Sequence, residues 1–228
     1  YDQIVHDVAM QGLPFLFAID RAGLVGADGE THHGVFDLSF TSHIPGLVVM
    51  SPKDGRELER MMEYAIENRL TACIRYPRGK AYHYGGNCKE MKLELGMMET
   101  VKDGKDVAII TEGGSFRKGW HIWRSLKQKG YSPALINARF ISPIDREGIA
   151  SILEKFEKVL VIEENLNKGG LGDRIAKILS EKPAKARLKC FAYPDQFMKH
   201  GDVELLEEDY RMNWESILAD ALPFLEGE

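Results

Sequence analysis

Residues 15–37 read FLFAIDRAGLVGADGETHHGVFD, and this stretch decides the fold. Its first five residues are apolar and include aromatic and β-branched side chains, which predicts a buried strand of a parallel sheet. A long loop with glycines at positions 23, 26, 29 and 34 follows that strand. Because open α/β sheets bind their ligands beyond the carboxyl ends of parallel strands, we expect a ligand site in this loop.

Three side chains of the loop suit a charged ligand. Arg21 offers a planar fork for a phosphate or carboxylate, Asp28 offers a negative charge, and His32 titrates near neutral pH. Any one of them alone could be an ordinary solvated group. Their grouping on a glycine-bearing loop that is longer than the usual strand-to-helix connection favours a ligand site.

A second arginine follows another predicted strand of the same sheet. Residues 75–79 read RYPRG, directly after the apolar run 72–74. Parallel strands end at the same edge of a sheet, so we expect Arg78 to approach the loop that carries Arg21. Two converging arginines would form a phosphate clamp, and a surface arginine beside a turn is the alternative. Arg75 lies inside the strand, where a structural ion pair is one interpretation of it.

The whole chain alternates strand-like and helix-like segments, which predicts an α/β fold of two three-layer domains with mainly parallel sheets. The first domain is expected over residues 1–84, a linker over 85–94, and the second domain over 95–228. A helix is expected to begin at Asp54, with one apolar face made of Leu58, Met61, Met62, Ala65 and Ile66. Strands are expected at 15–19, 47–50, 72–76, 107–111, 134–136, 159–162 and 188–192.

Composition excludes several classes of function. The 228 residues carry a net charge of −5 with mixed signs, which argues against nucleic acid as the main partner. No run of apolar residues is long enough to span a membrane, and no targeting segment is visible. The three cysteines form no CxxC pair, which favours reduced thiols and a cytoplasmic location. Cys73 and Cys190 lie in apolar runs and are expected to fill the core.

Two other site types are disfavoured by spacing. His32 and His33 could bind zinc, but adjacent residues rarely hold one ion together and no third ligand is suitably spaced. The glycine clusters at 112–115 and 169–172 lack the GxGxxG spacing of a dinucleotide site. Tight strand-to-helix turns account for both clusters.

Four motifs, FAIDRAGLVGADGETHHGVFDLSF, RYPRG, VIEENLNKGGLG and YPDQFMKHG, together resemble the 1-deoxy-D-xylulose-5-phosphate synthase family of transketolase-like thiamine-diphosphate enzymes. The resemblance covers essentially the whole chain. It implies that residues 1–84 are the latter part of a pyrimidine-binding domain and residues 95–228 a transketolase-type C-terminal domain. It also implies a homodimer that condenses pyruvate with D-glyceraldehyde 3-phosphate and releases carbon dioxide.

Carried over residue by residue, the resemblance implies that Arg21 and Arg78 hold the triose phosphate. It places Asp28 and His32 near the reacting carbons. The ligands of thiamine diphosphate and Mg²⁺ lie upstream in this family and are expected outside this chain. The chain begins with what looks like the middle of a helix, so we expect it to be part of a longer protein and to be inactive alone.

Alternatives remain open at this point. The β-type subunit of a 2-oxo-acid dehydrogenase and a split transketolase share the same order of domains, although the loop with its arginine argues against both. A non-catalytic dimerisation module is a further alternative, because the second domain shows no chemistry of its own.

Overall fold

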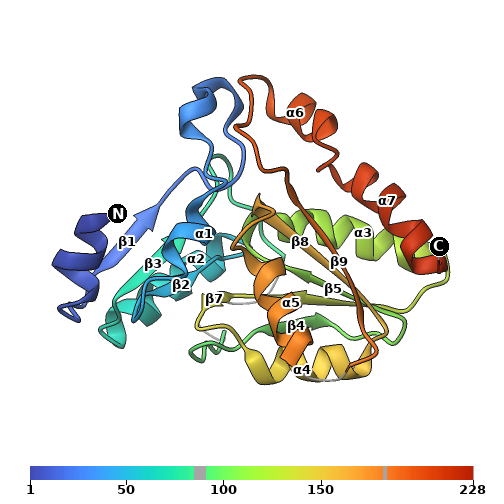
Figure 1. Cartoon of the computed structure of the whole chain (residues 1–228), viewed down its shortest axis with the longest axis horizontal. Coiled ribbons are helices and arrows are strands. Elements are labelled where there is room, and N and C mark those ends of the chain that lie inside the picture. Colours follow the sequence, from blue (N-terminus) through green and yellow to red (C-terminus); the bar gives the residue numbers. More distant parts are fainter. Residues whose placement is uncertain (85–90, 182–183, 228) are drawn as a thin grey trace.

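The computed structural model describes residues 1–84, 91–181 and 184–227 (Figure 1). The strands are β1 (Leu16–Ile19), β2 (Val48–Met50), β3 (Ala72–Arg75), β4 (Glu99–Lys102), β5 (Val107–Thr111), β6 (Pro133–Asn137), β7 (Phe140–Ser142), β8 (Lys158–Leu166) and β9 (Arg187–Tyr193). The α-helices are α1 (Asp37–Thr41), α2 (Gly55–Glu67), α3 (Phe116–Gln128), α4 (Arg146–Lys155), α5 (Leu171–Glu181), α6 (Val203–Asp209) and α7 (Trp214–Glu226). A π-helix, η1 (Ile4–Ala9), begins the chain, and short 3₁₀ turns occur at η2 (Gly26–Asp28), η3 (Glu30–His32) and η5 (Gly113–Ser115). The predicted linker 85–94 lies partly outside the described residues, as does Cys88.

The first sheet has the strand order β1-β3-β2-β7. β1, β3 and β2 are parallel to one another, as expected for a strand-loop-strand-helix-strand sequence. β7 comes from the second half of the chain and pairs antiparallel with β2, where Met50 lies opposite Phe140. The two halves of the molecule therefore share one sheet, which the sequence did not indicate.

The second sheet has the order β4-β6-β5-β8-β9. All its pairings are parallel except that of β4 with β6. The predicted α/β fold with mainly parallel sheets is confirmed. The unexpected strands, β4 and β7, are the antiparallel ones, and each is only three or four residues long.

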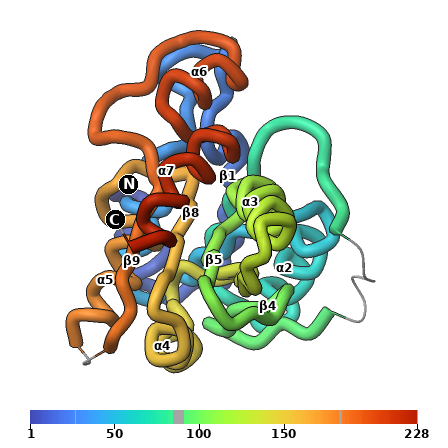
Figure 2. Tube along the Cα trace, turned by 90° about the vertical axis from the view of Figure 1, so that its right-hand side faces the viewer, coloured from blue at the N-terminus to red at the C-terminus, as the bar shows by residue number. Residues whose placement is uncertain are grey.

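Helices cover both faces of the second sheet, which gives the predicted three layers (Figures 1 and 2). On one face, α3 and α7 pack their apolar side chains, among them Ile122 and Ile217, against Ile109 of β5. On the other face, α4 and α5 pack Ile152 and Ile175 against the same sheet. Such burial contributes about 1.5–3 kcal/mol for each large apolar side chain, so both layers stabilise the second half.

The core is continuous between the two halves. Val49 of β2 and Cys73 of β3 belong to the same buried cluster as Ile110 of β5 and Ile149 of α4. The opposite face of the first sheet packs on α2 through Met61. The second half therefore serves as the third layer of the first sheet.

α2 begins as its sequence predicts, because the Asp54 side chain accepts a hydrogen bond from the backbone N–H of Glu57 at 2.9 Å. The predicted apolar face is only partly correct. Met61 and Ala65 are buried, but Met62 and Ile66 are exposed, since the helix packs on the sheet along a narrower stripe than the five apolar positions cover.

Two predictions of burial were wrong. β1 lies at the edge of its sheet, so its side chains are only partly covered, and Phe15 is 48% exposed. Cys73 is buried as predicted, but Cys190 is an exposed free cysteine on β9, the edge strand of the second sheet. In both cases the apolar run lies on an edge strand, which has a neighbouring strand on one side only.

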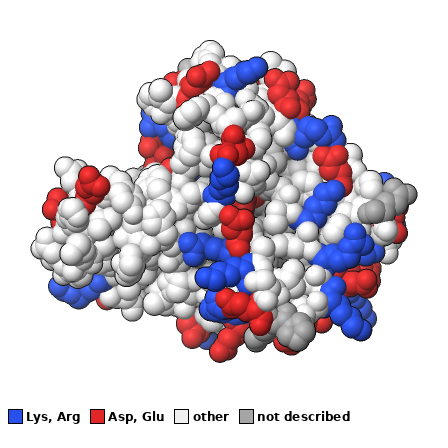
Figure 3. All heavy atoms as spheres, in the orientation of Figure 1, with Lys and Arg blue, Asp and Glu red and all other residues white. Residues whose placement is uncertain are grey.

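The charges on the molecular surface are mixed in sign. Figure 3 shows Lys and Arg interspersed with Asp and Glu on one face, and a weakly charged region over the N-terminal end on the left. No helix within the described ranges has both the length and the apolar character needed to cross a bilayer.

Candidate functional site

The register of the first sheet places the two predicted arginines at neighbouring strand ends. Ile19 of β1 lies opposite Arg75 of β3, and the next residue, Tyr76, donates its backbone N–H to the Ile19 carbonyl oxygen at 3.0 Å. Ala22 in turn donates to the carbonyl of Tyr76 at 3.0 Å. The chain therefore leaves both strands at the same edge, with Arg21 and Arg78 a short distance beyond it.

Arg21 and Arg78 both bind the carboxylate of Asp28. Arg21 donates from Nε to Asp28 Oδ2 at 3.2 Å, and Arg78 donates from its guanidinium to the same oxygen. Hydrogen bonds from Arg78 and then Arg21 hold the pKa of Asp28 below its usual range. Arg21 also contacts Asp20 at 2.6 Å. The site is thus a cationic pair already occupied by an internal anion.

Arg21 has an uncommon backbone conformation for a residue with a side chain. Its φ angle is +65°, in the left-handed region that non-glycine residues rarely adopt. The conformation is held by a close approach, since a methyl group on Gly34 would lie 2.1 Å from the Arg21 carbonyl oxygen. Gly34 also exchanges two backbone hydrogen bonds of 2.9 Å with Gly23. Strain of this kind is common at functional sites.

His32 is not drawn into this cluster. It lies on η3, its side chain is exposed, and its ring nitrogen Nδ1 is 3.0 Å from the hydroxyl of Thr31. The structure therefore brings together Arg21, Asp28 and Arg78, and leaves His32 at the rim of the same loop.

Arg75 is the centre of a buried polar network beneath the loop. It is 1% exposed and donates to Glu112 Oε2 at 3.0 Å. Its other terminal nitrogen donates to the carbonyl oxygens of Gly34 at 2.8 Å and Glu164 at 2.9 Å, and its Nε lies 3.6 Å from Asp37. The interpretation of Arg75 as a structural ion-pair partner is confirmed.

Glu112 links this network to both halves of the molecule. Its carboxylate accepts hydrogen bonds from the Ser51 hydroxyl, from Arg75, and from the backbone N–H of Glu164 at 2.8 Å. Three strand ends, those of β2, β3 and β5, therefore meet at one carboxylate. The glycine cluster 112–115 forms the tight turn predicted for it, as the 3₁₀ turn η5.

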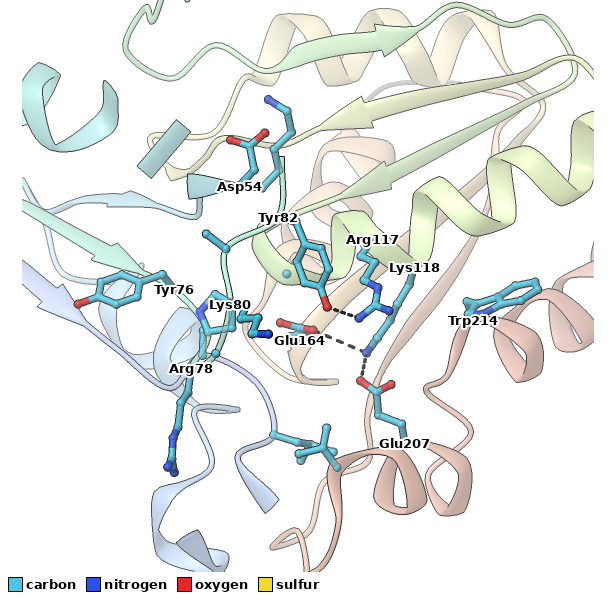
Figure 4. A pocket seen from close by; sticks show the side chains of 18 of the residues that line it. Asp54, Tyr76, Arg78, Lys80, Tyr82, Arg117, Lys118, Glu164, Glu207 and Trp214 are labelled. Atoms are coloured by element: carbon cyan, nitrogen blue, oxygen red, sulfur yellow. Dashed lines mark hydrogen bonds and ion pairs between the residues drawn. The ribbon is translucent and has the colours of Figure 1, made fainter. Parts of the chain in front are cut away.

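A cleft of about 1140 Å³ opens beside the arginine pair, between the two halves (Figure 4). Arg78 lies at its edge and points away from the opposite wall, where Lys118 of α3 contacts Glu207 of α6 at 2.8 Å and Glu164 at 3.7 Å. Arg117 donates to the hydroxyl of Tyr82 across the cleft. The positive charge of Lys118 in this wall is thus matched by two acids.

Two neighbouring acids at the end of β8 are buried. Glu163 accepts hydrogen bonds from the backbone N–H groups of Leu171 and Gly172 at the start of α5, at 2.7 and 3.0 Å. Glu164 faces Lys118. Burial raises the pKa of Glu163 to about 7 and that of Glu164 to about 7. Both acids therefore titrate near neutral pH.

Glu164 should make the protein less stable as the pH rises. Between about pH 4.5 and 7 the folded state keeps a proton that the unfolded chain has lost, so the free energy of unfolding falls across this range, by on the order of 3 kcal/mol for this group. In Glu164→Gln this contribution is absent, and the variant should be more stable than the parent at pH 8 but not at pH 5. Urea denaturation at both pH values measures this, with Glu204→Gln as an exposed control. Equal pH dependence in Glu164→Gln and the parent would contradict the prediction.

Sequence reasoning missed the buried acids and the contacts of the second half with the loop. The signal available was the pair of acids that directly follows the apolar run 159–162, and the single acid that follows 107–111. Carboxylates at the ends of buried strands seldom remain unpaired. Their partner could not be named, because Arg75 is 37 residues from Glu112 in the sequence.

Among the described residues no group of three or more His, Cys, Asp and Glu side chains could hold a metal ion.

Comparison with known protein families shows which family this chain belongs to. Residues 96–217 match the family described as transketolase, C-terminal domain, and residues 1–82 match transketolase, pyrimidine binding domain. The chain belongs to the transketolase family. Within this family it is similar to 1-deoxy-D-xylulose-5-phosphate synthase of Syntrophomonas wolfei, with 45% identity over 96% of the chain and 34% of that enzyme. The synthase of Halothermothrix orenii is 41% identical over 99% of the chain and 36% of that enzyme.

The transketolase-family chain thus spans about a third of the length of these curated relatives. Among solved structures, a protein titled "Split gene transketolase, inactive beta4 tetramer" has a TM-score of 0.88 and covers 99% of this chain and 71% of its own. Its sequence identity is 23%, so this likeness supports the fold alone.

Proposed function

We propose that this chain is the triose-phosphate-binding portion of a 1-deoxy-D-xylulose-5-phosphate synthase. In this reaction pyruvate loses carbon dioxide and its remaining two carbons join D-glyceraldehyde 3-phosphate. The observation that carries the proposal is the convergence of Arg21 and Arg78 on one anionic oxygen from two neighbouring strand ends. Two relatives with 45% and 41% identity that bear this enzyme's name support it.

Arg21 and Arg78 would bind the phosphate in place of Asp28. A phosphate dianion carries more charge than a carboxylate and offers three oxygens to the two guanidinium groups. The turn that carries Asp28 lies between Gly26 and Gly29, whose φ angles are +57° and +87°, so the carboxylate can move without strain at a side chain. Phosphate binding would thus release Asp28 from both arginines.

Asp28 and His32 would act at the reacting end of the triose. Once separated from the arginines, Asp28 loses the interactions that lower its pKa and becomes a better proton acceptor. The exposed ring of His32 is free to donate a hydrogen bond to the carbonyl oxygen of the aldehyde. These two roles follow the family resemblance.

The remaining portion of the enzyme would supply thiamine diphosphate and Mg²⁺, and the active protein would be a homodimer. The exposed edge of β1 with Phe15, and the weakly charged region in Figure 3, suit contact with the rest of the enzyme or a second subunit. The free thiols of Cys73 and Cys190 suit a cytoplasmic enzyme.

A chimera tests the proposal. This chain replaces the segment of the Syntrophomonas wolfei enzyme to which it aligns, and the product is assayed with pyruvate, D-glyceraldehyde 3-phosphate, thiamine diphosphate and Mg²⁺. We expect one carbon dioxide for each 1-deoxy-D-xylulose 5-phosphate formed, and no product from the chain alone. The unaltered Syntrophomonas enzyme is the control for the assay.

Two outcomes would contradict the proposal. One is a folded chimera that binds the cofactor but forms no product. The other is a chimera that transfers two carbons only from sugar phosphates and leaves pyruvate untouched, which would favour a transketolase. If the isolated chain binds thiamine diphosphate with micromolar affinity in calorimetry and turns over, the expectation that it is inactive alone is wrong.

A further inference from the structure

The loop that carries the arginine pair lies directly against the second half of the chain. A methyl group on Gly26 would be 2.6 Å from the carbonyl oxygen of Gly201 and 2.9 Å from the Val203 side chain, so the two backbones are in contact. Figures 1 and 2 both show the blue loop beside the red segment that leads into α6.

His33 joins the two segments. The side chain is 6% exposed, and its Nδ1 accepts the backbone N–H of Val25 at 3.1 Å. Its Nε2 lies 3.0 Å from the carbonyl oxygen of Lys199. Since Nδ1 accepts, the ring proton is on Nε2 and is donated to Lys199. A single neutral imidazole therefore ties both ends of the turn 25–33 to the second half.

Lys199, the partner of His33 in the second half, is itself held by further contacts. Lys199 donates its backbone N–H to the hydroxyl of Tyr210 at 3.2 Å. Tyr210 packs edge-to-face against Tyr193, which is fully buried at the end of β9, with ring centroids 6.4 Å apart. The chain of contacts from His33 thus ends in the core of the second sheet.

We propose that His33 is a positioning residue for the phosphate site. Asp28 and His32 both lie on the turn between Val25 and His33, and both ends of this turn are held by the one imidazole. With His33 in place, both ends of the turn stay fixed, so only its middle, between Gly26 and Gly29, has to move when a phosphate displaces Asp28. The identity of the ligand rests on the proposed function. The claim that His33 fixes the turn rests only on the contacts described above.

Two substitutions separate the contacts of His33. His33→Gln places an amide nitrogen near the position of Nε2 and can still reach Lys199. His33→Asn places an amide oxygen near the position of Nδ1, so it can accept from Val25 but cannot reach the second half. His43→Asn, at an exposed histidine outside the turn, is the control.

Hydrogen exchange and ligand affinity are measured on the whole chain. In His33→Asn we expect exchange of the amides in 23–34 and 197–202 to rise about tenfold, and the affinity for glycerol 3-phosphate in calorimetry to fall about five- to tenfold. The urea midpoint should stay within the range of the control. In His33→Gln, affinity and exchange should be close to those of the parent.

Normal exchange and normal affinity in His33→Asn would overturn the inference. So would equal losses in both His33 variants that track a lower urea midpoint, because they would indicate a purely structural role. If the parent itself fails to bind glycerol 3-phosphate, the proposed function and the phosphate part of this inference are both overturned. In that case, comparing amide hydrogen exchange between the parent and the two His33 variants still tests whether His33 fixes the loop.

Discussion

Replacing Arg75 with methionine is expected to cost about 3–5 kcal/mol of the free energy of unfolding. The substitution removes a buried guanidinium that is 1% exposed and leaves the Glu112 carboxylate without its cation. It also removes the side-chain donor to the Glu164 carbonyl oxygen and one of the two donors to the Gly34 carbonyl oxygen, which keeps its hydrogen bond from Gly23. Buried charges and polar groups that lose their partners are among the largest single sources of destabilisation.

Urea denaturation at pH 7 measures this effect. Arg60→Met is the matched control, because Arg60 forms only surface ion pairs with Glu63 and Glu67 and should cost less than about 1 kcal/mol. Adding Glu112→Gln to Arg75→Met should recover part of the loss, since the uncompensated charge is then removed. A loss below about 1 kcal/mol in Arg75→Met would show that the network does not join the two halves as described.

Loss of either clamp arginine should act on one substrate only. In the chimera, Arg21→Gln and Arg78→Gln are each expected to raise the KM for D-glyceraldehyde 3-phosphate at least about 30-fold, which corresponds to about 2 kcal/mol or more for a charged contact. The KM for pyruvate should stay unchanged, because pyruvate has no phosphate. Steady-state kinetics with one substrate varied at a time measures both values.

Arg146→Gln serves as the control for the clamp, since Arg146 is an exposed arginine paired with Glu181. It should leave both KM values unchanged. An equal rise in both KM values for Arg21→Gln or Arg78→Gln would indicate general damage to the site. Unchanged KM values in both variants would contradict the proposal that Arg21 and Arg78 form a phosphate clamp.

The positions of the two arginines could be predicted because they depend on local pattern and on one general rule. Apolar runs identify β1 and β3, parallel strands end at the same edge, and Arg21 and Arg78 lie two or three residues beyond those ends. The register then brings both toward the same loop. The contact of Asp28 with both arginines could not be predicted. A sequence does not show which nearby charged side chain pairs with an arginine when no ligand is bound.

The contacts between the halves could not be predicted from the sequence. β7 is three residues long and was not distinguishable from a turn, yet it joins the first sheet. The sequence places His33 beside His32 in the ligand loop but does not reveal its contact with the second half, because its partner Lys199 is 166 residues away. Exposure was misjudged at Phe15 and Cys190 for a related reason, since an apolar run does not reveal whether its strand lies at the edge of a sheet.

The central claim is that Arg21 and Arg78 form one anion site. The most direct measurement is an NMR titration of the chain with glycerol 3-phosphate that follows the arginine Nε–H signals, with glycerol as the uncharged control. The account predicts that the Arg21 and Arg78 signals shift together along one saturable binding curve, that glycerol leaves both in place, and that the Arg146 signal does not move. Signals of Arg21 and Arg78 that remain unchanged, or that follow two unrelated curves, would contradict it.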